Sequence, residues 1–180
     1  PHAGKAVDVN SVLPDGGRLL PSGTDVMFDN RTHWMTDAEG GNYRVFAIDG
    51  SDAQRGDATG ENMIERYCTG NFLAGQRLIY ASASGLPVGR YVFKAVVQKG
   101  ADGGVIELFA NDDRSPVTSV KVLRETEVAT DVLDQDLTVG VESGLNNACQ
   151  WVSFADVALE YQSPYMLLEE AVAASDTLTY

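Results

Sequence analysis

Histidine and cysteine are scarce in this chain, whose 180 residues contain two of each. The cysteines, Cys68 and Cys149, form no C-x-x-C pair and stand near no histidine, so the usual zinc-site patterns are excluded. Two alternatives remain for them: buried thiols, or one disulfide formed in an oxidising compartment. A bridge would close a long loop, to which chain-entropy models assign roughly 4 kcal/mol of stabilisation.

Catalytic motifs are also absent. A Ser-His-Asp triad would have to use His33, because His2 stands at the start of the chain, and no G-x-S-x-G nucleophile elbow occurs. H-E-x-x-H and a phosphate-binding P-loop are both missing. Carboxylates are plentiful, but no pattern marks two of them as a glycosidase pair. We therefore predict a protein that is not an enzyme.

Basic residues are few: 13 Lys and Arg against 26 Asp and Glu give a formal net charge of −13. A nucleic-acid partner needs basic side chains to neutralise phosphates, so the charge excludes one, and it disfavours anionic membranes and strongly anionic glycans. No run approaches the ~18 apolar residues of a membrane-spanning helix, so no membrane insertion is predicted. The segment Pro1–Lys5 is not apolar either, so we expect no signal peptide in this chain and interpret it as a mature fragment.

What the chain does have is an alternation of apolar and polar residues with a period of two, which is typical of half-buried β-strands. Turn residues separate about ten such runs, which favours an antiparallel β-sandwich over βαβ units. A turn is expected over Ala110–Pro116. The predicted strands are Ala6–Val12, Tyr43–Ile48, Asn62–Tyr67, Gln76–Ala83, Arg90–Gln98, Val105–Ala110, Val117–Leu123, Glu127–Leu133, Leu137–Val141 and Trp151–Tyr161. The fold class is therefore all-β, with the sandwich over residues 1–162.

Residues 163–180 depart from this pattern. Tyr165–Ala174 is helical in composition, and Ser163 and Pro164 suit a helix cap and first turn. We interpret this segment as a short C-terminal helix that begins a connection to another domain. The alternative is a terminal helix that packs on the sandwich.

Four acidic residues stand close together around a glycine-containing loop. Oxygen ligands of this kind suit Ca²⁺, although the spacing matches no EF-hand. A structural calcium ion is one prediction, and an exposed acidic loop is the alternative. The candidate ligands are Asp49, Asp52, Asp57 and Glu61.

The aromatic residues suggest a binding site. A sugar presents a flat apolar face with a rim of hydroxyl groups, so its sites combine exposed rings with a few polar groups. Trp34 lies in a long early loop and Tyr43 follows it, while Trp151 opens the last strand and turns outward if Val152 and Phe154 face the core. The alternative is that each ring caps the core. The predicted ligand-binding residues are Trp34, Tyr43, Arg44, Asn146, Asn147 and Trp151.

Three segments resemble the galactose-binding-like jelly rolls of bacterial polysaccharide-processing and cell-surface proteins. Gln76–Lys99 is similar to their strand that runs into G-L-P-x-G and then into an aromatic-rich strand. Trp151–Tyr161 resembles their closing strand, W-x-x-F-D-N-V-x-L, with Ala155 and Asp156 where that pattern has Asp and Asn. Phe109–Ser119 resembles their middle hairpin.

The resemblance covers approximately Glu61–Tyr161 and implies a secreted or cell-surface bacterial protein. It also implies an accessory role beside other domains of the same polypeptide. Many such modules bind carbohydrate, and some hold a structural calcium ion. We therefore expect a non-catalytic carbohydrate-binding or carbohydrate-associated module, with a neutral carbohydrate and neighbouring domains as partners. The alternative is a structural or protein-interaction sandwich with no glycan ligand.

Overall fold

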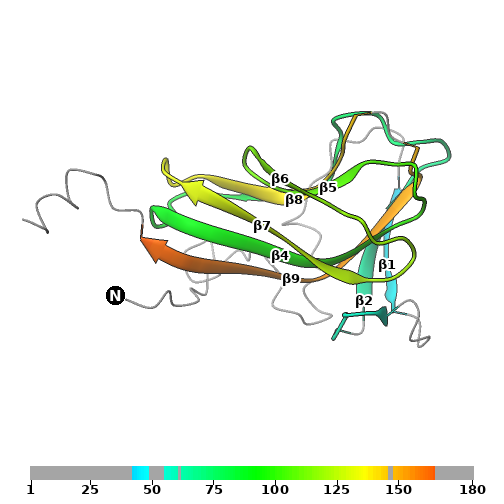
Figure 1. The fold of residues 1–180 in the computed structure, drawn as a ribbon, viewed down its shortest axis with the longest axis horizontal. Helices are drawn as coiled ribbons and strands as arrows, with labels where there is room; N and C mark the ends of the chain where they lie inside the picture. The colour runs from blue at the N-terminus through cyan, green and yellow to red at the C-terminus, as the bar shows by residue number, and fades with distance from the viewer. Residues whose placement is uncertain (1–41, 49–54, 61, 146–147, 165–180) are drawn as a thin grey trace, which may run out of the picture.

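The computed structural model describes residues 42–48, 55–60, 62–145 and 148–164. In this part of the chain, nine antiparallel strands form two sheets that pack face to face, as Figure 1 shows. The strands are β1 (Asn42–Ala47), β2 (Asn62–Tyr67), β3 (Arg77–Ala83), β4 (Gly89–Lys99), β5 (Ile106–Ala110), β6 (Asp113–Pro116), β7 (Arg124–Val132), β8 (Leu137–Ser143) and β9 (Trp151–Pro164). The predicted all-β antiparallel sandwich is confirmed.

Strands that are remote in sequence lie side by side in both sheets. The five-stranded sheet has the order β1-β2-β9-β4-β7, and the four-stranded sheet has the order β3-β8-β5-β6. The right-handed twist turns β1 and β2 steeply away from the direction of β4 (Figure 1). The last described strand, β9, lies between β2 and β4 and pairs with both.

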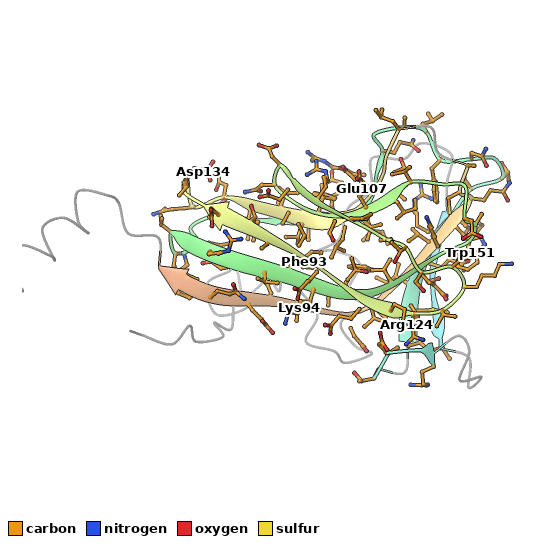
Figure 2. The ribbon with its side chains drawn as sticks, in the orientation of Figure 1. Phe93, Lys94, Glu107, Arg124, Asp134 and Trp151 are labelled. Carbon is orange, nitrogen blue, oxygen red and sulfur yellow. The ribbon has the colours of Figure 1, made fainter. Side chains whose placement is uncertain are left out.

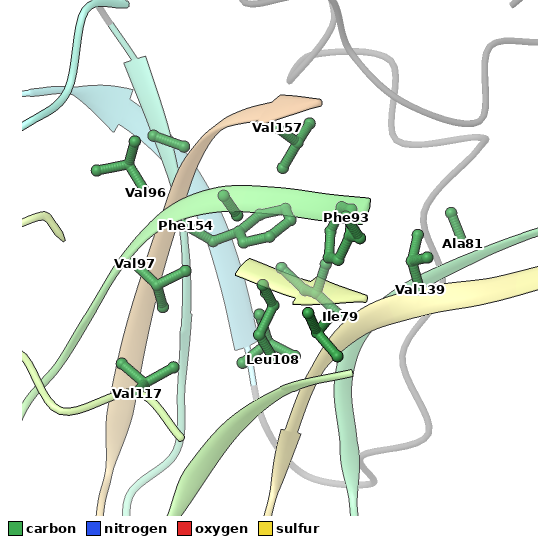
Figure 3. Packing of buried hydrophobic residues seen from close by; sticks show 14 of the residues in the cluster. Ile79, Ala81, Phe93, Val96, Val97, Leu108, Val117, Val139, Phe154 and Val157 are labelled. Atoms are coloured by element: carbon green, nitrogen blue, oxygen red, sulfur yellow. The ribbon is translucent and has the colours of Figure 1, made fainter. Parts of the chain in front are cut away.

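The core lies between the sheets and follows from the alternation of each strand. Phe93 and Phe154 of the five-stranded sheet extend toward Ile79, Leu108 and Val139 of the four-stranded sheet (Figure 3). The centroids of the two phenyl rings are 6.4 Å apart. Each of these side chains is buried, and full burial of such a side chain contributes about 1.5–3 kcal/mol.

A buried tyrosine contacts both the turn between β3 and β4 and the C-terminal half of β9. The hydroxyl of Tyr91 donates a hydrogen bond of 2.7 Å to the carbonyl oxygen of Pro87. Its ring packs edge-to-face against the ring of Tyr161, with centroids 5.2 Å apart. Burial in this apolar site raises the pKa of Tyr91 to about 12, because the phenolate would lose its hydration.

The loop 55–60 is held against β9 by one aspartate. Asp156 adopts φ 46° where the pairing of β4 with β9 is irregular. Its Oδ1 accepts a hydrogen bond of 3.0 Å from the backbone N–H of Gly60, and its Oδ2 accepts from the hydroxyl and backbone N–H of Thr59. Aspartate tolerates the left-handed region better than most residues, so it suits both the backbone and the contact.

The segment 110–123 differs from the prediction. Val117–Leu123 is not a strand: Val117 and Leu123 insert into the core from a loop, and Val120 makes one isolated bridge to Lys99. The strand here is β6, which lies within the predicted turn. Apolar residues at both ends of a loop mimic strand alternation, because each end must anchor in the core.

The predicted helix start at Ser163 is also wrong. β9 continues to Pro164, with Ser163 paired to Arg90 and Pro164 to Gly89. The rest of the expected helix and the expected strand Ala6–Val12 lie outside the described residues. Within the described ranges, no helix is long and apolar enough to cross a membrane.

Candidate functional site

The candidate site lies on the outer face of the five-stranded sheet, the face turned away from the four-stranded sheet. Val152 and Phe154 are buried in the core, so alternation along β9 places Trp151 and Ser153 on the outer face. The Trp151 side chain is half-buried there. It lies at one end of the sandwich, whereas Asp134 marks the opposite end (Figure 2).

The strand register groups five outer-face side chains into two rows. Ser153 pairs with Glu65 on β2 and with Gln98 on β4, and we call these three residues the polar row. Trp151 pairs with Tyr67, and we call this pair the aromatic row. Each aromatic residue is two positions along its strand from a polar-row residue, so on each of β2 and β9 the rows are separated by about 7 Å.

Two oxygens of the polar row are buried without a hydrogen-bond partner among the described residues: Oε1 of Gln98 and Oγ of Ser153. The side chains are 2% and 0% exposed. The Gln98 amide nitrogen is 4.0 Å from Sδ of Met63, which is a weak acceptor. A buried polar atom left without a partner costs about 1–3 kcal/mol, and a ligand or water hydroxyl would remove that cost.

The strand β1 continues both rows at the level of the backbone. Asn42 is the register partner of Tyr67, and Arg44 is the register partner of Glu65. The predicted ligand residue Arg44 is therefore in register with the polar row, whereas Tyr43 is the register partner of Arg66. The side chains of the predicted residues Trp34, Tyr43, Arg44, Asn146 and Asn147 lie outside the described part of the structure.

Four residues of the two rows were missed by reasoning from the sequence: Glu65, Tyr67, Gln98 and Ser153. A signal was present for Gln98, which is a polar residue in an otherwise apolar stretch of β4. Tyr67 and Glu65 share their alternation parity on β2, which predicts a common face. Nothing in the sequence states that β9 lies between β2 and β4.

Of the four predicted calcium ligands, only Asp57 lies among the described residues. Its Oδ1 accepts a hydrogen bond of 2.8 Å from Nη1 of Arg124, and its Oδ2 accepts one of 3.1 Å from the backbone N–H of Glu125. These two donors lower the pKa of Asp57, the N–H of Glu125 having the larger effect. Among the described residues, no three acidic, histidine or cysteine side chains form a possible metal site. The remaining predicted ligands are Asp49, Asp52 and Glu61.

The two cysteines are present as thiols rather than as a disulfide. Cys149 is buried and Cys68 is half-buried at the end of β2. Their sulfur atoms contact different backbone carbonyl oxygens, that of Gly70 at 2.7 Å for Cys68 and that of Trp151 at 2.9 Å for Cys149.

The outer face of the four-stranded sheet also carries aromatic residues, but their rings are covered by cations. The guanidinium carbons of Arg114 and Arg77 lie 5.2 and 5.9 Å from the centroid of the Phe109 ring. Arg77 also lies 5.3 Å from the centroid of the Tyr80 ring, and Arg114 pairs with Glu142. Such cation–π contacts occupy faces of the Phe109 and Tyr80 rings.

No protein-family model matches the sequence, and no curated protein is significantly similar to it. Solved structures do share its fold. The xylan-binding domain CBM22-1 of Xyn10C from Paenibacillus barcinonensis has a TM-score of 0.50 and 11% identity, over 73% of this chain and 87% of that domain.

Two further similar structures come from other kinds of protein. The Stig cyclase Fisc from Fischerella sp. TAU has a TM-score of 0.54 and 17% identity, over 74% of this chain and 86% of the cyclase. The enzymatically active domain of tailspike protein 4 from bacteriophage CBA120 has a TM-score of 0.53 and 8% identity, over 79% of this chain and 21% of the tailspike chain. At these identities the likeness concerns the fold. The described part of this chain therefore shares its β-sandwich fold with these structures, among them a xylan-binding module.

Proposed function

We propose that this chain is a non-catalytic carbohydrate-binding module that binds a neutral glycan on the outer face of its five-stranded sheet. The observation that carries the proposal is the aromatic row beside a polar row that contains two buried oxygens without partners. The rings of Tyr67 and Trp151 offer apolar area to the face of a sugar ring. The unpartnered oxygens of Gln98 and Ser153 are buried in this structure, so they would accept sugar hydroxyl groups only where binding of the ligand uncovers the polar row.

The charge of the chain favours a neutral ligand. The formal net charge is −13, and Glu65 adds a carboxylate to the polar row itself. A net charge of this sign disfavours binding of a uronic acid or a sulfated sugar and favours a neutral one. The shared fold with a xylan-binding domain supports a neutral polysaccharide as the first ligand to test.

Binding without catalysis is part of the proposal. Among the described side chains of the two rows, Glu65 is the single carboxylate, whereas glycoside hydrolysis ordinarily requires two. The cyclase among the similar structures means that the fold does not decide this point. In this role the chain would be an accessory module of a larger secreted or cell-surface protein, next to other domains of the same polypeptide.

The test is calorimetric titration of the purified chain with a panel of soluble polysaccharides, including xylan, β-1,4-galactan and a uronic-acid polymer. We expect binding to a neutral polymer and none to the uronic-acid polymer. Tyr67→Ala and Trp151→Ala are each expected to weaken binding about tenfold or more, which corresponds to the loss of about 1.4 kcal/mol. Tyr80→Ala is the matched control, because Tyr80 lies on the outer face of the other sheet.

Two results would contradict the proposal. One is the absence of binding to every polymer of the panel by the folded chain. The other is equal weakening by Tyr67→Ala and Tyr80→Ala, which would place the ligand elsewhere. Thermal unfolding of each variant distinguishes loss of binding from loss of fold.

A protein-interaction module is the second candidate, favoured by three exposed apolar side chains at one end of the sandwich. Leu73, Val105 and Leu145 are 68%, 41% and 76% exposed. Their loops meet at the end of β8, where the Ser143 hydroxyl donates to the carbonyl oxygen of Leu73 and the Gly144 N–H donates to that of Val105. Exposed apolar groups of this kind mark contact surfaces. Two results together would favour this role: no glycan of the panel binds, and the chain self-associates in sedimentation experiments unless Leu145→Ser is introduced.

A further inference from the structure

We propose that Gly100 is a positioning residue for the ligand platform: because it has no side chain, the indole of Trp151 lies directly over its backbone. This inference rests on the proposed function, since it explains how the aromatic row is held ready for a sugar. Gly100 directly follows β4, and its N–H donates a hydrogen bond of 3.0 Å to the carbonyl oxygen of Trp151. The two backbones are thereby fixed against each other.

The argument begins with the space that a side chain at Gly100 would need. A Cβ atom built on Gly100 would lie 2.4 Å from Nε1, 2.6 Å from Cε2 and 2.8 Å from Cδ1 of Trp151. Contacts below 3.0 Å essentially never occur for a real Cβ, so the indole would have to move. All three atoms belong to the five-membered ring, so the indole occupies the very position that a Cβ would fill.

The backbone conformation at Gly100 does not itself require glycine. The described glycines with positive φ are Gly56, Gly75 and Gly85, and Gly100 is not among them. Alanine could therefore adopt the backbone angles of Gly100 without strain. The three atoms nearest to a Cβ at this position all belong to the indole ring, so the ring accounts for the requirement for glycine.

An indole held in this way has few alternative positions. Binding then loses little side-chain entropy, which is the usual advantage of a preorganised aromatic contact. A methyl group at position 100 would tilt or lift the ring and disturb its alignment with Tyr67 on the neighbouring strand. We therefore expect Gly100→Ala to weaken glycan binding about tenfold while the sandwich stays folded.

The experiment uses ¹⁹F NMR of the full chain labelled with 5-fluorotryptophan. The chain contains two tryptophans, so two resonances are expected, and Trp151→Phe identifies the resonance of Trp151. Gly100→Ala should shift the Trp151 resonance. Gly70→Ala is the control, because a Cβ at Gly70 meets no atom within 4 Å and its φ is not positive; it should leave the Trp151 resonance in place.

A double-mutant cycle covers the case in which Gly100→Ala destabilises the fold. The free energy of unfolding in urea is measured for Gly100→Ala, Trp151→Phe and the double variant. If the methyl group clashes with the indole, Gly100→Ala should cost clearly less stability in the Trp151→Phe background. An equal cost in both backgrounds, or an unchanged Trp151 resonance, would overturn the proposal.

Titration with the neutral polymer of highest affinity in the panel separates this inference from the proposed function. If no polymer binds the parent chain, the proposed function fails, while the NMR and stability measurements still decide whether Gly100 positions the indole. If the parent binds and Gly100→Ala binds equally well with a shifted resonance, the platform role of Gly100 is refuted.

Discussion

Two buried serines offer a direct test of the polar row, because both are 0% exposed and only one has hydrogen-bond partners. Oγ of Ser153 has no partner among the described residues. Oγ of Ser143 donates to the carbonyl oxygen of Leu73 and accepts a hydrogen bond of 3.1 Å from the N–H of Gln76. The same change, serine to alanine, should therefore have opposite effects on stability at the two positions.

The expected magnitudes follow from the cost of a buried polar atom. Ser153→Ala removes an unpartnered hydroxyl, which should raise the free energy of unfolding by about 1 kcal/mol or more. Ser143→Ala leaves the carbonyl of Leu73 and the N–H of Gln76 without this partner, which should lower it by about 1–3 kcal/mol. In a domain of this size, about 1 kcal/mol corresponds to a shift of about 2–4 °C in Tm.

Urea unfolding followed by fluorescence measures both changes, and glycan titration adds the second half of the prediction. Ser153→Ala should weaken binding severalfold while it stabilises the chain, since a lost hydrogen bond is worth about 0.5–1.5 kcal/mol. Ser143→Ala should leave the affinity unchanged. The reasoning is refuted if Ser153→Ala destabilises the chain as much as Ser143→Ala does, because Ser153 would then have a partner that stabilises the fold.

Two further predictions concern contacts of β9, one with Tyr91 of β4 and one made by Asp156 of β9 itself. The pKa of Tyr91 is about 12 in the folded chain and about 10 in the unfolded chain, so the folded state binds the proton more tightly. The resulting contribution to the free energy of unfolding is fully present below pH ~10 and should be lost as the pH rises toward ~12. Tyr91→Phe should remove this fall and cost about 0.5–1.5 kcal/mol at neutral pH, and an equally steep alkaline fall in the variant's urea unfolding would contradict the assignment. Asp156→Ala should be less stable than Asp156→Asn by roughly 1 kcal/mol, because alanine tolerates the left-handed conformation less well. Equal Tm values for the two variants would show that the conformation at residue 156 relaxes.

The strands predicted most accurately are those in which burial of one face in the core requires apolar residues at alternate positions. β2 has the predicted bounds Asn62–Tyr67, and β4 differs from its prediction by one residue at each end. The three segments that resemble galactose-binding-like jelly rolls lie in this sandwich, and the predicted β-sandwich fold is shared with a solved xylan-binding module.

The errors arose where tertiary contacts override local pattern. β6 (Asp113–Pro116) is a short edge strand of polar residues and proline, a composition equally typical of a turn. Ser163 and Pro164 suit a helix start locally, yet pairing with β4 keeps them extended. Local propensity gives no warning of either outcome, because the deciding partner strand is remote in sequence.

The candidate site was predictable only in part for the same reason. Alternation alone turned Trp151 outward, but its neighbour Tyr67 comes from a strand near the start of the described region. Gln98 comes from a third strand. The order β2-β9-β4 creates the rows, and strand order is a property of the whole fold rather than of any segment.

The position of β9 has a consequence for the order in which the chain folds during synthesis. During synthesis, β2 and β4 emerge from the ribosome before β9. The two strands do not pair with each other, so they are joined in one sheet only when β9 pairs with both. Pairings between such distant segments are slow to form. The proposed binding face would therefore be the last part of the sandwich to form. A nascent or truncated chain that lacks β9 would carry Tyr67 and Gln98 but, under the proposal, would have no ligand affinity.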